Sequence, residues 1–485
     1  MSAFRELYQE LDKNMIKTNL IQRAYSSALY HDRWKKKITD ITSLNGYEGL
    51  TKLPYTSAED LRVTWDKYPV EEIILTETVG FWYNTSGSMG NKKWIPWTFN
   101  DYEKAGLRLA ETISQYLEPT DRILIIALPP PFISGTTPFK LLENTGRLGK
   151  PLEILAFAPE YIQDGFGLLM KRKPTAMIGT PSLTLRMADE IAINTPKVLK
   201  AQAAEEKSLK LKLAAAVTKV KKIYPKHIFK DMKCGFFGGE RLDPFRKAIE
   251  EKWGLEAYDV FAFTEGFSGG FECKEHNGMH FPSNNGIIEI ISEKELEKEE
   301  NDPTYQPEAI ILSEAEKGLV GELVLTDFKE ALPMIRYRVR DKVLVVSPEE
   351  CICGQENPRL KILGRTDGII NLGVIRLSAI IFDRLLRKDF KSGKVNLWEV
   401  YVTRDKYTPK IVLTIEPEFV KDEEVFKKEL FESLHSFDIF HRGYDNGLFA
   451  FDEIKFTSKL QLEVYGQGKS KTVRYDPDFN KPVKF

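Results

Sequence analysis

The chain has 485 residues, which is too long for one ordinary hydrophobic core, so two or more domains are expected. Hydrophobic residues make up 42% and charged residues 29%, as is normal for a soluble globular protein. The formal net charge of -1 excludes an overall cationic field for holding a nucleic-acid backbone, so a nucleic-acid binder is disfavoured.

The N-terminal residues, MSAFRELYQELDKNMIKTNL, are charged throughout and lack the apolar centre of a signal peptide. The strongest apolar run, ILIIALPPPF, is too short to span a bilayer. We therefore expect a cytoplasmic protein without membrane insertion. A cytosolic chain rarely forms disulfides, so metal binding or chemistry is the expected use of its four cysteines: Cys234, Cys273, Cys351 and Cys353.

Residues 1–80 predict helices with an apolar stripe, as in FRELYQEL and LIQRAYSSALY. From residue 121 onward, short apolar runs such as PLEILAF alternate with amphipathic stretches such as YIQDGFGLLMKR. This alternation predicts an α/β architecture with largely parallel strands. After about residue 363 the chain becomes strand-rich, which predicts a smaller α+β domain over 364–485 that follows a large domain over 1–363.

Two segments have the character of insertions. Residues 194–227 are rich in Ala and Lys at helical spacing. A solvated surface helix is favoured over one that lies on a membrane, because Glu205, Glu206 and the many alanines weaken an apolar stripe. The second segment, SEKELEKEENDPTYQPEA, is acidic and turn-rich, and it predicts an exposed loop.

The segment YNTSGSMGNKKW, which begins at Tyr83, has the composition of a phosphate-binding loop. Glycines let backbone N–H groups approach a phosphate, and hydroxyls and lysines add donors and charge. A plain hairpin turn would have a similar composition. The segment is not a Walker A loop, because Gly87 and Gly90 are three residues apart and no G-K-[ST] follows. GQGKS near the C-terminus is no P-loop either, because Glu463 stands where the motif requires its first glycine.

Two carboxylates follow apolar runs. Glu265 comes after YDVFAF, where the end of a buried strand would place it to hold Mg²⁺ against a nucleotide phosphate; a helix N-cap region is the alternative. Asp341 ends LPMIRYRVRD and could accept two ribose hydroxyls or start a turn. The alternation before it predicts a half-exposed strand with an apolar face and a basic face: Ile335, Tyr337 and Val339 against Arg336, Arg338 and Arg340.

Two short clusters have metal-ligand residues. CKEHNGMH contributes Cys273 with His276 and His280, and CICG contributes Cys351 and Cys353. Three cysteines and one histidine would complete a tetrahedral structural Zn²⁺ site. Isolated buried cysteines are common, but the two clusters together use three of the four cysteines and two of the six histidines, which favours a metal. We expect His280 as the fourth ligand, with His276 as the alternative.

Taken in order, these motifs resemble those of adenylate-forming enzymes, and more narrowly of the phenylacetate–CoA ligase family. The resemblance runs from about residue 60 to the end. The family's phosphate loop, [ST]-[ST]-G-[ST]-T-G-x-P-K, matches residues 85–93, with Met89 in place of a threonine and Lys92 in place of a proline. This match assigns ATP phosphate contacts to Thr85, Ser86, Gly87, Ser88, Gly90 and Lys93.

Other segments are similar to further family motifs. GTPS, from Gly179, resembles a strand-end segment, and FFGGERL resembles the G-G-E segment that lines the adenine and acyl pockets, through Gly238, Gly239 and Glu240. FAFTE corresponds to Y-G-x-[ST]-E, which implies Mg²⁺ binding by Glu265 and a phosphate contact by Thr264. Phe261 and Ala262 depart from the family's Tyr and Gly, so Phe261 is the ring expected to stack on adenine, unless the stacking is altered.

PMIRYRVRD resembles P-x-I-R-Y-x-x-x-D, which implies that Asp341 binds the ribose. LGRTDGIINLG resembles the G-R-x-D hinge region, with Arg365 near the ribose and phosphate and Asp367 as the pivot. The cysteine and histidine pairs look like those of family members that carry structural zinc. For the C-terminal catalytic lysine we favour Lys469, which directly follows Gly468, over Lys471.

The resemblance implies an ATP-dependent, Mg²⁺-requiring, AMP-forming ligase that joins a carboxylic acid to CoA. An aryl or arylacetic acid is expected, because aromatic rings suit a flat apolar ligand, although some of the rings would simply be core: Trp82, Tyr83, Phe132, Phe236 and Phe237, with Gly239 and Phe261 nearby. Two alternatives are an adenylyltransferase that uses no CoA, for example with a deazaflavin acceptor, and a non-catalytic nucleotide-binding relative. A homodimer is compatible with the sequence.

Overall fold

The computed structural model describes residues 3–84, 94–127, 133–157, 162–205, 222–266, 269–282, 286–302, 304–365, 369–373, 375–386, 388, 390–460, 463–465, 469–471 and 473–479. Within residues 3–80 the regular elements are helices joined by turns and loops, as predicted. These helices are α1 (Ala3–Lys17), α2 (Leu20–Tyr25), α3 (Ala28–Trp34), α4 (Gly46–Thr51), α5 (Ala58–Lys67) and α6 (Val70–Ile73).

One twelve-stranded sheet organises the N-terminal part, in the order β11-β10-β12-β13-β14-β9-β8-β7-β6-β5-β3-β4. Neighbours from β4 to β7 run parallel, and the other neighbours run antiparallel. The parallel half comprises β3 (Arg122–Ile126), β4 (Glu153–Phe157), β5 (Ala176–Gly179), β6 (Cys234–Phe237) and β7 (Glu256–Ala262). The antiparallel half comprises β8 (Gly269–Glu272), β9 (Met279–His280), β10 (Gly286–Ser292), β11 (Ala309–Ile311), β12 (Val320–Asp327), β13 (Tyr337–Ser347) and β14 (Arg359–Arg365).

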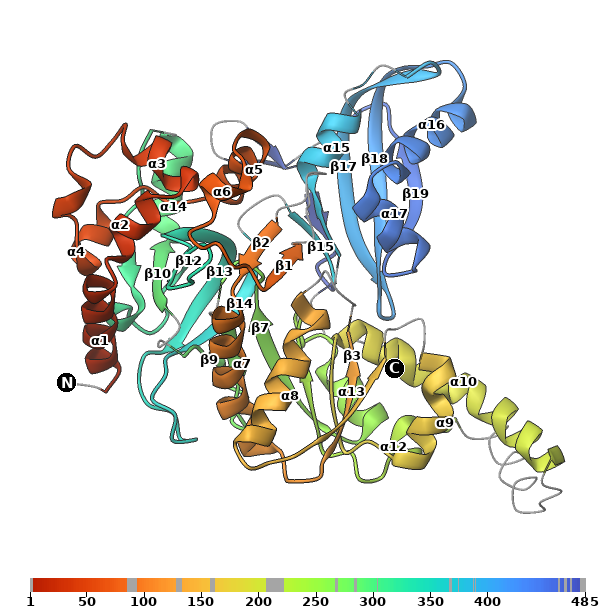
Figure 1. Cartoon of the computed structure of the whole chain (residues 1–485). Coiled ribbons are helices and arrows are strands. Elements are labelled where there is room, and N and C mark those ends of the chain that lie inside the picture. The colour runs from red at the N-terminus through yellow and green to blue at the C-terminus, as the bar shows by residue number, and fades with distance from the viewer. Residues whose placement is uncertain are drawn as a thin grey trace.

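The expected α/β class is confirmed, with a mixed sheet. Alternate residues of β3 enter different cores, because side chains of a strand point to opposite faces. Ile123 and Ile125 pack in one core with Ile113 and Leu141, whereas Leu124 packs in another. The helices that accompany this half of the sheet in Figure 1 are α7 (Phe99–Ile113), α8 (Thr137–Arg147), α9 (Ile162–Arg172), α10 (Pro181–Glu205), α12 (Pro225–Ile228) and α13 (Arg246–Trp253).

Within the antiparallel half, β8 and β14 are joined through a very short strand. β9 has two residues, and it pairs with β8 on one side and with β14 on the other. Phe271 and Arg359 are both register partners of His280. The continuity of the twelve-stranded sheet therefore passes through Met279 and His280. A separate hairpin, formed by β1 (Phe81–Asn84) and β2 (Trp94–Trp97), lies outside this sheet.

Three expectations are corrected. The basic face that was expected to be half-exposed is largely buried: Arg336 pairs with Glu289 at 3.0 Å and Arg338 with Glu322 at 2.6 Å, which compensates the burial of their charges. The acidic segment expected to be a loop contains a helix, α14 (Glu293–Asn301), because Ser292 caps it by accepting a hydrogen bond from the Glu295 amide.

The third correction concerns the boundary at residue 194. Helix α10 is continuous from Pro181 to Glu205 and contains Pro196, so the segment begins inside a helix that already packs on the sheet. Residues 206–221 of this segment lie outside the described ones. Among the helices of the described ranges, none is both long and apolar enough to cross a membrane.

The C-terminal part forms a separate domain with its own core (Figure 1). Its four-stranded sheet, ordered β19-β18-β17-β22, carries helices and two further hairpins. The elements are β15 (Ile369–Leu372), β16 (Ile375–Ser378), α15 (Ala379–Leu386), β17 (Gly393–Asp405), β18 (Thr408–Val420), α16 (Glu423–His435), α17 (Asp438–Asp445), β19 (Ala450–Phe456), β20 (Glu463–Tyr465), β21 (Lys469–Lys471) and β22 (Val473–Tyr475).

The turn between β17 and β18 docks this domain onto the large one. Tyr407 at the turn is 8% exposed and belongs to the core cluster of α10 and α13. The ammonium of Lys252 bonds to the Tyr407 hydroxyl, lies 4.6 Å from the Tyr407 ring centroid and pairs with Asp189 at 2.6 Å. Arg186 adds a hydrogen bond of 3.0 Å to the carbonyl of Gly447. These contacts fix where the C-terminal domain sits.

Candidate functional site

The carboxyl ends of β5 and β6 bring two sequence motifs together. Gly179 and Phe237 are register partners, and the Gly238 amide donates to the Gly179 carbonyl at 3.1 Å. Gly239 has a φ of 88°, a conformation that favours glycine, and it turns the chain at this strand end. Glu240 Oε1 then accepts a hydrogen bond of 2.8 Å from the Ser182 amide, and burial raises the pKa of Glu240 to about 7.

The end of β7 positions Phe261 to Glu265. The Phe261 ring is half-buried and packs against Phe281 at a centroid distance of 5.8 Å, whereas Ala262 is exposed. The Thr264 carbonyl accepts a hydrogen bond of 3.2 Å from Trp97 Nε1. Glu265 is 9% exposed, and its Oε1 accepts a hydrogen bond of 3.0 Å from the Tyr337 hydroxyl. A nearly buried carboxylate is thereby held in one orientation between the two halves of the sheet.

A buried pair supports Glu265, and the sequence analysis did not single it out. Lys329 is fully buried, donates a hydrogen bond to the Glu265 carbonyl and lies 3.8 Å from Asp327 Oδ2. Burial lowers the pKa of Lys329 and raises that of Asp327 to about 6. The sequence signal for this pair is TDFKE, in which charged residues directly follow an apolar strand. Lys329 is a positioning residue for the Glu265 peptide.

Asp341 and Arg365 lie opposite each other on β13 and β14. Their Cα positions are register partners, and Arg365 Nη1 donates to Asp341 Oδ2 at 3.2 Å. Asp341 is 5% exposed. A carboxylate oriented by a guanidinium is suited to accept hydrogen bonds from vicinal hydroxyls, such as those of a ribose.

Several predicted residues lie outside the described ones: Asp367, Phe132 and the proposed phosphate loop, residues 85–93. The backbone of Lys469 and Lys471 is described, and both residues lie on β21, which pairs antiparallel with β20. Their register partners are Tyr465 and Glu463 respectively.

The aromatic residues predicted to line an acyl pocket separate into two groups. Phe236 is 1% exposed and packs against Tyr116, Tyr258 and Phe271, so it is a core residue. Phe237 is also fully buried in a core. Tyr83 and Trp82 come from β1: the Tyr83 hydroxyl accepts a hydrogen bond of 2.8 Å from Thr136, and Trp82 is 36% exposed.

Three cysteines and a histidine form a cluster at β9, the two-residue strand. One ligand atom from each of Cys273, His280, Cys351 and Cys353 lies within 4.8 Å of all the others. The Sγ atoms of Cys273 and Cys351 are 3.9 Å apart, and Cys353 Sγ is 3.4 Å from His280 Nε2. Tetrahedral zinc with ordinary bond lengths requires ligand separations of roughly 3.5–3.8 Å, so the arrangement fits zinc.

The second ring nitrogen of His280 has its own partner. Nδ1 lies 3.0 Å from the Asn357 carbonyl, a contact that fixes the ring so that Nε2 faces the thiols. Cys351 and Cys353 belong to a tight turn in which the Gly354 amide donates to the Cys351 carbonyl at 2.8 Å. Gly354 has a φ of 86°, which favours glycine at this position.

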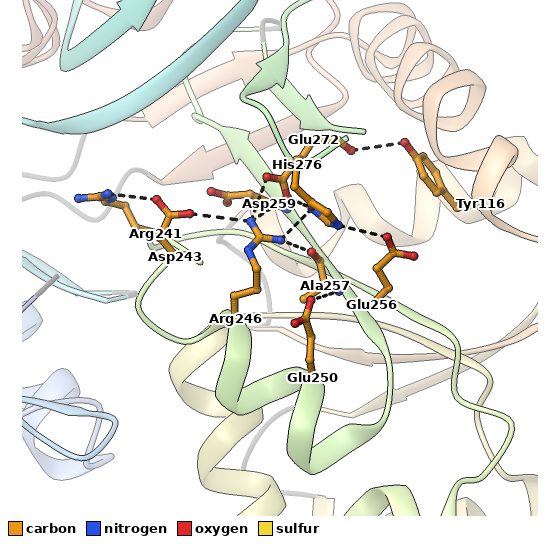
Figure 2. Close-up of polar contacts among 10 residues, drawn as sticks. All are labelled: Tyr116, Arg241, Asp243, Arg246, Glu250, Glu256, Ala257, Asp259, Glu272 and His276. Atoms are coloured by element: carbon orange, nitrogen blue, oxygen red, sulfur yellow. Dashed lines mark hydrogen bonds and ion pairs between the residues drawn. The ribbon is translucent and has the colours of Figure 1, made fainter. Parts of the chain in front are cut away.

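His276, the alternative fourth ligand, lies elsewhere (Figure 2). Its Nε2 is 3.1 Å from Glu256 and its Nδ1 is 3.2 Å from Glu272. Arg246 joins the same network by pairing with Glu272 at 2.8 Å. The structure therefore selects His280 for the cluster and uses His276 in a surface ion network.

Comparisons with known proteins find similarity to CoA ligases. No family model matches the chain. A phenylacetate–coenzyme A ligase of Pseudomonas putida is 26% identical over 361 residues, which are 72% of this chain and 69% of that protein. A phenylacetate–coenzyme A ligase of Aromatoleum evansii is 23% identical over 428 residues, 86% of this chain and 85% of that protein.

Among solved structures, a 2-hydroxyisobutyryl-CoA ligase in complex with 2-HIB-AMP and CoA, in the thioesterification state, has a TM-score of 0.67. It is 20% identical, and the match covers 96% of this chain and 90% of that chain. The same ligase in the postadenylation state has a TM-score of 0.54 at similar coverage. At this identity the likeness demonstrates a shared fold.

Proposed function

Because this chain is a relative of the phenylacetate–coenzyme A ligases and has the fold of the adenylate-forming ligases, we propose that it is an AMP-forming acid–CoA ligase. The observation that carries the proposal is the contact of Glu265 with Tyr337 on β13, the strand that also holds Asp341, which pairs with Arg365 on β14. Glu265 would bind the phosphate-bound Mg²⁺, and Asp341 would bind the ribose. A nucleoside triphosphate with bound Mg²⁺ requires both carboxylates.

The proposed reaction has two steps. In the first, a carboxylate oxygen of the acid attacks the α-phosphorus of ATP, a P–O bond forms and pyrophosphate leaves. In the second, the sulfur of CoA attacks the acyl carbon, the C–O bond to the phosphate breaks and AMP leaves. Adenylation is needed because a free carboxylate has a poor leaving group. No covalent enzyme nucleophile takes part.

The chain's own residues would bind and orient the reactants. Asp341, oriented by Arg365, accepts hydrogen bonds from the ribose, and the strand ends at Gly238 and Phe261 border the adenine and the acid. Glu265 fits Mg²⁺, because it presents a hard carboxylate oxygen held in place by Tyr337 and Lys329. When bound, Mg²⁺ neutralises charge on the phosphates as pyrophosphate departs.

For the acid we propose an aryl or arylacetic substrate. The names of the two bacterial relatives support an arylacetic acid, and Trp82 on β1 and Phe261 on β7, which are not fully buried, supply rings. Tyr83 and Phe236 are fully buried in cores, so they do not support the pocket. Aromatic side chains suit flat apolar ligands.

The function is tested by mass spectrometry of one reaction mixture. It contains the protein, ATP, Mg²⁺ and a panel of aryl, arylacetic and short aliphatic hydroxy acids, with and without CoA. We expect an acyl-CoA and AMP to form when CoA is present, with the aromatic acids turned over fastest. An AMP-linked product without CoA dependence would instead support the adenylyltransferase, and no turnover of any acid would support a non-catalytic relative. Preference for the aliphatic acids would contradict the aromatic pocket.

The contacts of Tyr407 support a specific role for the β17–β18 turn. The TM-score is higher for the thioesterification state of the similar ligase than for its postadenylation state, and these are two conformations of one protein. We infer that the docking of Tyr407 beside Lys252 belongs to the arrangement that carries out the second step. Tyr407 is thus a positioning residue for CoA transfer.

Replacing Tyr407 should separate the two half-reactions. Tyr407→Ala should slow thioester formation from supplied acyl-adenylate by about 10- to 100-fold, because losing about 1.4–2.8 kcal/mol from the docked arrangement changes its population by that factor. Pyrophosphate release in the first step should stay near normal. Tyr407→Phe, which keeps the ring, should have a smaller effect, and Lys410→Ala on β18 is the control. Equal losses in both half-reactions would contradict this role.

We also propose that Cys273, His280, Cys351 and Cys353 bind one structural Zn²⁺. A four-ligand site with thiolates is the closed type that contributes to folding and leaves no position for substrate. The Sγ separation of 3.9 Å is far longer than a disulfide bond, so two of these thiols face each other without being joined.

Metal analysis of the purified protein should find about one zinc per chain. Cys273→Ser should lose this zinc and unfold at a lower temperature, because a buried ligand set without its metal is left unsatisfied. The matched control is Cys234→Ser, since Cys234 is buried in β6 outside the cluster. A folded protein without metal, or equal zinc loss in both variants, would disprove the site.

A further inference from the structure

A second group of metal-ligand side chains lies on the C-terminal domain, where α16 is followed by α17 (Figure 1). His435 is the last residue of α16. His441 and Asp445 are four residues apart on α17, so they lie on one face of that helix. Two of the six histidines of the chain thus meet one carboxylate.

The three side chains converge at metal-binding distances. His435 Nε2 is 2.9 Å from Asp445 Oδ1, His441 Nδ1 is 3.0 Å from Asp445 Oδ2, and the two ring nitrogens are 3.2 Å apart. For metal–ligand bonds of about 2.1 Å, tetrahedral and octahedral sites require ligand separations of roughly 3.0–3.4 Å. All three separations lie in or next to that range, with a different oxygen of Asp445 facing each ring nitrogen.

Either protons or a cation can satisfy this arrangement. Each ring nitrogen can donate a hydrogen to a different oxygen of Asp445, with the two nitrogens 3.2 Å apart. With one of the two nitrogens unprotonated, its contact with Asp445 would join two acceptors. One cation between the three groups would accept a lone pair from each of them.

The surroundings hold the first ligand in place and leave the site open. The His435 ring stacks on Phe431 at 5.6 Å and meets the edge of Tyr444 at 6.0 Å. His435 also lies in the last turn of α16, where the helix dipole favours positive charge. The side chains of His435, His441 and Asp445 are 32%, 49% and 44% exposed, so solvent ions reach them.

We propose that His435, His441 and Asp445 form a second metal site, one that binds a divalent first-row transition-metal cation such as Ni²⁺ or Zn²⁺. Two imidazoles and one carboxylate are ligands of intermediate softness, and they favour such ions over Mg²⁺ or Ca²⁺. Three protein ligands leave coordination positions for water or an external ligand. The site is therefore exchangeable, in contrast to the closed thiolate cluster, and it is independent of the proposed ligase activity.

The test is equilibrium dialysis of the full chain against NiCl₂, with nickel and zinc counted separately by mass spectrometry. The wild type should bind one nickel per chain while its zinc content stays constant. Asp445→Asn, which keeps the side-chain shape, and His441→Ala should each weaken nickel binding about tenfold or more.

The matched control is His31→Ala, which removes an exposed histidine far from α16 and α17 in the sequence. It should bind nickel as the wild type does. Thermal unfolding without added metal should be similar for Asp445→Asn and the wild type, so that a loss of binding is not a loss of folding. No nickel on the wild type, unchanged binding in both site variants, or equal loss in the control would each overturn the proposal.

Discussion

Glu265→Gln should reduce adenylation by about 10²- to 10³-fold, the usual effect of removing one electrostatic group that stabilises a transition state. Glutamine keeps the shape of the side chain and can still accept the hydrogen bond from Tyr337. It lacks the negative charge that would hold Mg²⁺ beside the phosphates. The variant therefore tests the effect of the negative charge without changing the shape of the side chain.

The measurement is pyrophosphate release at increasing Mg²⁺ concentrations. The magnesium requirement of Glu265→Gln should rise as its rate falls, because a ligand of the ion is lost. Tyr337→Phe should have a weaker effect, since it removes one hydrogen bond and leaves the carboxylate. Glu316→Gln, at an exposed position, is the matched control. Near-normal release by Glu265→Gln would refute the magnesium assignment.

Lys469→Ala should separate the two half-reactions in the direction opposite to Tyr407→Ala. Adenylation should fall by about 10²- to 10³-fold, because the ammonium would offset charge as pyrophosphate leaves. Thioester formation from supplied acyl-adenylate should remain within about threefold, because no phosphate charge of that kind develops in the second step. The two half-reactions are followed separately, by pyrophosphate release and by acyl-CoA formation.

We favour Lys469 over Lys471, because Lys469 directly follows Gly468. The Cα register partner of Lys469 is Tyr465, and that of Lys471 is Glu463. Lys471→Ala should leave adenylation near normal. If Lys471→Ala shows the split between half-reactions and Lys469→Ala does not, the catalytic lysine is two residues further along the chain.

Much of the fold follows from local sequence patterns. A continuous apolar run such as that of β3 specifies a strand buried on both faces, and the change to strand-rich sequence after residue 363 reflects a separate core. The cluster of three cysteines and a histidine could be predicted because a metal site draws on few residue types, and three of four cysteines lay in two clusters. The choice of His280 over His276 depended on chain geometry that spacing alone does not specify.

Other features depend on contacts between distant residues. The arginines at 336, 338 and 340 look like a solvent-facing row, yet Arg336, directly before β13, is buried and pairs with Glu289 on β10. Lys329 acts on Glu265 from 64 positions away, and Tyr407 docks beside Lys252 on another domain. Helix α14 was missed because its acidic composition suggested a loop, although a serine cap precedes it.

The two-residue strand β9 has a consequence for how metal and nucleotide influence each other. Glu265 follows β7 in the parallel half of the sheet, whereas Asp341 and Arg365 belong to the antiparallel half. His280, on the strand that lies between these two sites in the sheet order, is a ligand of the proposed zinc. Zinc that holds this strand in its native register would favour nucleotide binding across it, and thermodynamic linkage requires that nucleotide raise the affinity for zinc by the same factor. An ion that touches no substrate would then act as an allosteric effector, and saturating ATP should slow the loss of zinc to a chelator.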